Sequence, residues 1–131
     1  MARFCSLFSS SSGNCTYIGS SGGGVLIDAG VSAKQISLKL NSVGVSEKDI
    51  GAVFVTHEHS DHVKGLRVFA SKYNIPVYAT EGTICELEKM GIINGKFPVF
   101  PIGSGIECNG QLVTPFHTSH DVAESCGYSV T

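Results

Sequence analysis

Three of the chain's five histidines, His57, His59 and His62, fall within six residues, and Asp61 lies between the last two. Imidazole nitrogens and carboxylate oxygens are ligands that suit Zn²⁺, and also Fe or Mn, in a mixed nitrogen and oxygen shell. Side chains alternate along an extended strand, so His57 and His59 would point to the same side, with Asp61 and His62 following in a turn. Two pairs of ligands that point in different directions can bind two adjacent metal ions. The stretch therefore predicts a metal site rather than a set of surface histidines.

The two remaining histidines, His117 and His120, end a later strand-like segment. A site built from three imidazoles needs one more residue to join His57 and His59, and that residue must come from this second pair. Residue type alone does not rank His117 against His120.

Two other segments carry polar groups that could serve such a site. The Ser/Gly/Asn loop at residues 9–14, which includes Ser12 and Asn14, could present N–H groups and hydroxyls to an anion such as phosphate, or be an ordinary flexible turn. Asp28 closes an apolar run at residues 25–27, close to Gly30. Its carboxylate could form the turn or accept a hydrogen bond from a metal-binding histidine, and the residues alone favour the turn.

The pattern of apolar residues predicts the elements that position these groups. Strand-like segments at 3–8, 15–19 and 25–28, joined by short polar turns, predict an antiparallel meander. Helices are expected at 32–43, with Ser32 as the N-cap, and at 66–73 and 81–90. Further strands are expected at 52–55, 77–79, 97–102, 105–108, 111–116 and 127–130. Pro98 and Pro101 make the segment at 97–102 an edge or irregular strand. This order predicts a layered, mixed α/β fold.

Length and composition limit the class of protein. With 131 residues, 42% hydrophobic and 15% charged, the chain fits one domain or a piece of a larger one, with a core of its own. A net charge of -2 gives no general electrostatic argument for nucleic-acid binding, although a local basic patch can exist. No segment approaches the ~20 apolar residues of a membrane helix, and no signal peptide is recognisable, so we expect a cytoplasmic protein without a membrane partner. Five scattered cysteines are expected to be reduced and mostly buried.

Together these motifs resemble the metallo-β-lactamase-fold hydrolases, whose signature H-x-H-x-D-H is matched in full by the histidine stretch at 57–62. The segments at 10–15, 26–30, 55–62 and 119–128 are similar in particular to the WalJ-like branch, bacterial cytoplasmic hydrolases linked to DNA exonuclease activity. The resemblance covers the chain from its first strand to Tyr128.

The resemblance implies a set of roles for these residues. The fold would be the N-terminal half of an αββα sandwich, with a mixed sheet flanked by helices. The first metal would be held by His57, His59 and His120, which is preferred here over His117. The second metal would receive Asp61 and His62, and Asp61 would also orient the attacking hydroxide as the catalytic residue. Asp28 becomes a partner of the histidine loop, and Ser12 and Asn14 would lie near the substrate phosphate. The cofactor would be two Zn²⁺ ions, with Mn²⁺ or Fe as alternatives.

The function implied is a metal-dependent phosphodiesterase or exonuclease acting on nucleic acid. Members of the branch run to about twice this length, so residues 1–131 are expected to form a single partial domain without the C-terminal half. A bridging Asp and a final His ligand would then lie beyond Thr131, and the 131-residue chain alone would be inactive. The alternatives are a thioester or lactone hydrolase of the same fold, or a non-catalytic metal-binding half-domain that self-associates through an exposed apolar face.

Overall fold

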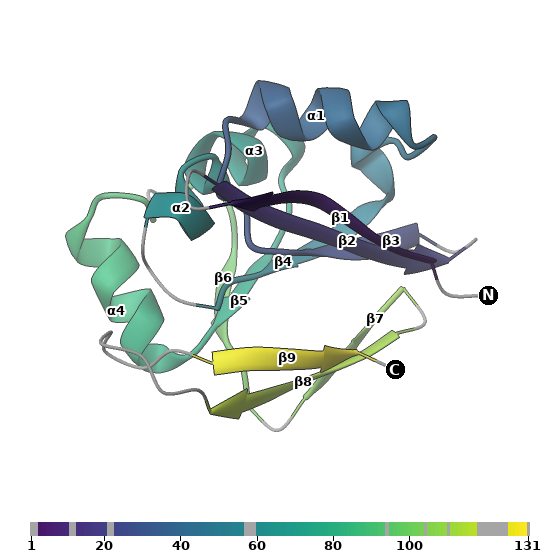
Figure 1. Ribbon diagram of the computed structural model, residues 1–131. Coiled ribbons are helices and arrows are strands. Elements are labelled where there is room, and N and C mark those ends of the chain that lie inside the picture. The colour runs from purple at the N-terminus through teal and green to yellow at the C-terminus, as the bar shows by residue number, and fades with distance from the viewer. Residues whose placement is uncertain are drawn as a thin grey trace.

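The computed structural model describes residues 3–10, 13–20, 23–56, 60–93, 95–103, 105–109, 111–117 and 126–130. These residues form two sheets and a set of helices. The larger sheet has six strands in the order β1-β2-β3-β4-β5-β6, and the smaller has three in the order β7-β8-β9. The helices lie on one side of the large sheet and the small sheet lies on the other (Figure 1). The expected mixed α/β fold is confirmed, with one face of the mixed sheet covered by helices and the other by strands.

The bounds of the strands are β1 (Arg3–Ser10), β2 (Gly13–Ser20), β3 (Gly23–Ile27), β4 (Ile50–Phe54), β5 (Val77–Ala79), β6 (Val99–Pro101), β7 (Ile106–Cys108), β8 (Gln111–His117) and β9 (Cys126–Val130). The helices are α1 (Ala33–Ser42), α2 (Ser60–Val63), α3 (Leu66–Tyr73) and α4 (Glu81–Lys89), and a 3-10 helix (Glu47–Asp49) precedes β4.

The large sheet is mixed. Strands β1, β2 and β3 form the predicted antiparallel meander, whereas β3, β4, β5 and β6 pair in parallel. Parallel neighbours need long crossover connections, and here these contain α1, the pair α2 and α3, and α4. Strand β6 is the edge of the sheet, as the prolines predict. The parallel half therefore carries its helices on a single face.

Local signals explain where the helices begin and end. The Ser32 side chain accepts a hydrogen bond from the Gln35 N–H at 3.3 Å, which confirms Ser32 as the N-cap of α1. Helix α3 has the predicted bounds and ends at Asn74, which adopts a left-handed conformation with φ of 51°. Helix α2 was expected only as a turn, but residues 60–63 form a short helix that includes Asp61 and His62. None of the helices in the described ranges combines the length and apolar character needed to cross a membrane.

Two hydrophobic cores lie on opposite faces of the large sheet, and β4 supplies both. Val53 packs in the core under the helices, while Ala52 and Phe54 pack in the core between the two sheets. The Phe54 ring stacks on Tyr78 at 5.2 Å and meets Tyr128 edge-on at 5.4 Å between centroids. A strand that is buried on both faces is apolar at successive positions, which explains the continuous apolar run before the histidines.

The connection between α2 and α3 leaves no room for a side chain at Gly65. A Cβ atom there would overlap the Val31 carbonyl oxygen and would lie 3.1 Å from the Ala33 nitrogen. Both neighbours are backbone atoms, which cannot move aside as a flexible side chain would.

We therefore expect Gly65→Ala to lower the free energy of unfolding by about 1–3 kcal/mol, the usual cost of overpacking. Urea denaturation followed by circular dichroism measures the change. Gly103→Ala is the matched control because a Cβ atom added there would have nothing within 4 Å, so its effect should stay within about 0.5 kcal/mol. Equal losses in the two variants would contradict this account of the packing.

Candidate metal centre

The candidate site lies at the carboxyl ends of β3 and β4, which are parallel neighbours. Strand β3 ends at Ile27, one residue earlier than predicted, and Asp28 directly follows it. The Asp28 N–H donates to the Phe54 carbonyl at 2.7 Å. Thr56 follows β4, and His62 comes from α2. Carboxyl ends of adjacent parallel strands meet at one edge of a sheet, which is where open α/β sheets bind ligands.

Asp28 is the centre of the hydrogen-bond network. The residue is only 4% exposed and adopts the left-handed conformation, with φ of 65°. Its carboxylate accepts the Thr56 N–H at 2.8 Å on Oδ1, and the Thr56 hydroxyl at 2.8 Å and His62 Nδ1 at 2.6 Å on Oδ2. The sequence offered a turn and a hydrogen-bond acceptor for a metal-binding histidine as alternatives for Asp28. The structure shows the carboxylate accepting from His62, and the role of His62 as a metal ligand stays a prediction.

Backbone hydrogen bonds fix the loop after Asp28 on both sides. The Ala29 N–H donates to the His62 carbonyl at 2.8 Å, and the Gly65 N–H donates to the Ala29 carbonyl at 2.8 Å. The Gly30 N–H donates to the Asn14 carbonyl, also at 2.8 Å. The carbonyl of the residue that carries the imidazole is therefore bonded directly to the loop that carries the carboxylate.

The Asp28 carboxylate determines which ring nitrogen of a neutral His62 carries the proton. An ionised carboxylate only accepts hydrogen bonds, so the proton of a neutral His62 ring sits on Nδ1 and the lone pair is on Nε2. A histidine that donates one nitrogen to a carboxylate and presents the other is the arrangement found at metal ligands. The Asn14 amide nitrogen lies 3.5 Å from His62 Nε2. A neutral imidazole with its lone pair on Nε2 is the kind of ligand that suits a divalent metal ion such as Zn²⁺.

The cysteine nearest this network is not a suitable ligand. Cys15 is fully buried, and burial is the main cause that raises the pKa of its thiol, with the charge of Asp28 as the second cause. Metal ligation requires the thiolate, which this environment disfavours. Cys15 therefore packs as an apolar residue. The expectation that most cysteines are buried is wrong for the other three whose side chains are described, because Cys5 and Cys108 are half-buried and Cys85 is exposed.

The structure brings together three of the predicted site residues, namely Asn14, Asp28 and His62. Asp61 lies in α2, where only its backbone is described. The predicted roles of His57, His59, His120 and Ser12 fall outside the described residues and stay predictions. In the part of the chain that is described, no group of three or more His, Cys, Asp or Glu side chains could hold a metal ion.

Thr56 and Tyr128 were not singled out from the sequence as site residues. Thr56 contributes two of the three hydrogen bonds to the Asp28 carboxylate. Its hydroxyl oxygen lies 3.3 Å from His62 Nδ1. Tyr128 donates from β9 to the Val55 carbonyl at 2.7 Å, so the small sheet reaches the end of β4. The position of Thr56, between an apolar strand and the first histidine, was the available signal.

Comparisons with known proteins agree with this arrangement. A model of the metallo-beta-lactamase superfamily matches residues 10–129. The chain is 38% identical over 130 residues to the exodeoxyribonuclease YycJ of Bacillus anthracis, covering 97% of this chain and 49% of that protein. It is 33% identical over 123 residues to the exodeoxyribonuclease WalJ of Streptococcus pneumoniae, covering 91% and 46%. The chain thus spans about half the length of these curated relatives.

A solved structure shows the same fold. The metallo-beta-lactamase fold protein YhfI of Bacillus subtilis superposes with a TM-score of 0.77 at 16% identity, covering 99% of this chain and 58% of that one. The order of strands and helices described above is therefore shared with a protein of very different sequence.

The Asp28 carboxylate should control metal affinity through the His62 ring. In Asp28→Asn the side chain keeps its shape, but its amide group can direct an N–H at Nδ1, which favours the other tautomer and places the proton on Nε2. We expect the Zn²⁺ affinity to fall by about 10–100-fold, the usual effect of removing such a partner. Competition with a chromophoric chelator measures the affinity.

Asp49→Asn is the control, because Asp49 is an exposed carboxylate in the 3-10 helix and has no contact with the site. Its Zn²⁺ affinity should equal that of the unchanged chain. An Asp28→Asn variant that is folded by circular dichroism and still binds Zn²⁺ with unchanged affinity would refute the assigned role of the carboxylate.

Proposed function

Because the chain belongs to the metallo-beta-lactamase superfamily, we propose that the whole protein is a metal-dependent hydrolase that cleaves phosphodiester bonds in nucleic acid. The observation that carries the proposal is the Asp28–His62 pair at 2.6 Å, which orients the imidazole and places the lone pair of its neutral form on Nε2, the nitrogen that a metal ion would bind. The two relatives with 33% and 38% identity are named exodeoxyribonucleases, and this supports nucleic acid as the substrate class.

We assign the metal ligands as the sequence predicts them. The proposed ligands are His57, His59 and His120 for a first metal and Asp61 and His62 for a second, with Zn²⁺ as the metal and Mn²⁺ or Fe as alternatives. A divalent metal ion, when bound, acts as a Lewis acid on a phosphoryl oxygen and lowers the pKa of water to about 7.

The chain's own residues would supply orientation. Asp28 and Thr56 hold the His62 ring in one position, as the three hydrogen bonds to the carboxylate show. Asp61 would accept a hydrogen bond from the attacking water and align it with the phosphorus atom. The Asn14 amide lies beside His62 Nε2 and, with Ser12, would donate to an oxygen of the substrate phosphate.

Thioester or lactone hydrolysis is less well supported. The two relatives that match over 97% and 91% of this chain, at 38% and 33% identity, are named exodeoxyribonucleases. The likeness to solved structures is at lower identity and bears on the fold, which does not determine the reaction. The single partial domain at residues 1–131, the cytoplasmic location and the self-association stay predictions.

A hydrolysis assay with matched variants tests the proposal. The whole protein is incubated with Mn²⁺ or Zn²⁺ and end-labelled linear DNA, with bis(p-nitrophenyl) phosphate and a thioester as parallel substrates. We expect cleavage of both phosphodiesters, complete inhibition by EDTA, and a rate at least about 10²-fold lower in Asp61→Ala, because a positioned acid-base group contributes this much or more. Product length on DNA then distinguishes exonuclease from endonuclease action.

Asp49→Ala serves as the control for loss of an acidic residue, since Asp49 is exposed in the 3-10 helix. It should hydrolyse DNA at the rate of the unchanged protein. Unchanged hydrolysis in Asp61→Ala would rule out the assigned role of Asp61, and cleavage of the thioester without cleavage of either phosphodiester would reject the nuclease proposal.

A further inference from the structure

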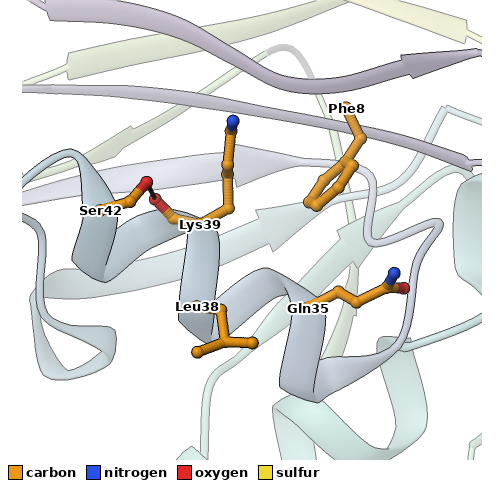
Figure 2. A pocket seen from close by; sticks show the side chains of 5 residues that line it. All are labelled: Phe8, Gln35, Leu38, Lys39 and Ser42. Carbon is orange, nitrogen blue, oxygen red and sulfur yellow. Dashed lines mark hydrogen bonds between the residues drawn. The ribbon is translucent and has the colours of Figure 1, made fainter.

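Three open, shallow hollows that share lining residues lie along α1 and α3. The first has a volume of about 310 Å³ and lies between β1, which contributes Phe8, and α1, which contributes its other four lining side chains (Figure 2). The second, about 400 Å³, lies between α1 and α3, and the third, about 360 Å³, lies along α3 beside Lys96. Leu38 lines the first and second hollows, and Val68 and Lys72 line the second and third. We refer to the three together as the helical-face groove.

Two exposed apolar side chains lie in this groove. Leu38 is 62% exposed and Val68 is 48% exposed, and both side chains line the hollow between α1 and α3. The Tyr73 ring and Ala33 line the same hollow. Covering apolar surface gains roughly 25 cal/mol per Å². Exposed apolar side chains that gather in a hollow with a polar rim are the usual mark of a protein interaction site.

The rim of the groove is basic although the chain is acidic. The whole chain has 9 Lys and Arg against 11 Asp and Glu. The three hollows are lined by five cationic residues and one acidic residue, and the cationic residues are Lys34, Lys39, Arg67, Lys72 and Lys96. More than half of the chain's positive side chains therefore surround one surface, where they set up a local positive potential.

The single acidic residue in this lining, Glu47, is engaged by its neighbours. Asn41 donates to one carboxylate oxygen at 3.1 Å and the Tyr73 hydroxyl donates to the other, also at 3.1 Å. Hydrogen bonding by its own backbone N–H, and then by Asn41, holds the pKa of the Glu47 carboxyl below its usual value. Glu47 thus fixes the Tyr73 ring at the side of the groove, and five cations remain against this one carboxylate.

We propose that the helical-face groove binds an acidic, amphipathic helical segment of a partner protein. Helices that dock into grooves place apolar side chains at a spacing of three and four residues onto an apolar floor, here Leu38 and Val68. Acidic residues on the flanks of that helix would meet the lysines of the rim, which supplies the charge complementarity. Nucleic acid fits less well, because its contacts are made mainly by phosphates and these gain nothing from exposed aliphatic side chains. The groove shares no lining residue with the candidate metal centre, so this proposal goes beyond the hydrolase function.

Fluorescence anisotropy with a designed peptide tests the proposal on the purified chain. The probe is a labelled peptide of about 16 residues, with leucines at helical spacing and glutamates elsewhere, long enough to form a helix on binding. Leu38→Ser should weaken binding at least about tenfold, which corresponds to 1.4 kcal/mol. Lys72→Glu should also weaken binding, and added salt should reduce the affinity of the unchanged chain because exposed charges are screened.

The matched controls lie outside the groove. Met90→Ser removes a side chain that is 49% exposed at the end of α4, and Lys48→Glu reverses an exposed charge in the 3-10 helix, so neither should alter binding. A peptide with lysines in place of the glutamates, a glutamate peptide without leucines, and a DNA duplex complete the probes. Binding of the acidic amphipathic peptide alone, with amide NMR shifts in α1 and α3, would support the proposal. Unchanged binding in Leu38→Ser, or equal binding of the DNA duplex, would overturn it.

Discussion

The described structure depends on the hydrogen bonds made to one buried carboxylate, that of Asp28. Asp28 is nearly inaccessible to water, and an unpaired charge in such a place would be very costly. Its three hydrogen bonds come from Thr56, two residues after the end of the neighbouring strand β4, and from the His62 imidazole of α2. Satisfying the charge therefore requires β3, β4 and α2 to meet at one point. The hydrogen bond that helps to stabilise the buried carboxylate also orients His62.

The contact is made by tertiary structure rather than by local preference. Helix α2 has only four residues, far fewer than an isolated helix needs to be stable in water. It is held by the backbone hydrogen bonds that join His62 and Gly65 to Ala29. The close approach is possible because Gly65 has no side chain, and Gly13 plays a similar part where its Cβ would lie 2.9 Å from the Gly30 carbonyl oxygen. A metal ligand on such a helix is preorganised only while these contacts last.

Much of the fold could be predicted from local patterns, whereas among the contacts within the site only the pairing of Asp28 with the histidine loop was expected, from the family resemblance. The N-cap at Ser32 and the bounds of α3 follow from short-range rules that the sequence displays directly. The meander of the first three strands follows from turns of few residues. The role of Thr56 was missed because its two bonds to Asp28 span 28 residues. The same holds for the contact between Asn14 and His62, which lie 48 residues apart. Contacts between residues so far apart leave no periodic pattern in the sequence.

The helical-face groove and the candidate metal centre are connected through α3. This helix begins at Leu66, immediately after Gly65, whose N–H is bonded to the loop that follows Asp28. A partner on the groove could influence the centre only if it bound two arrangements of α3 with different affinity. The close packing of Gly65 against the Val31 backbone opposes any shift of the start of the helix. Tight packing of this kind favours a groove that positions the protein beside its partner over one that switches the metal centre.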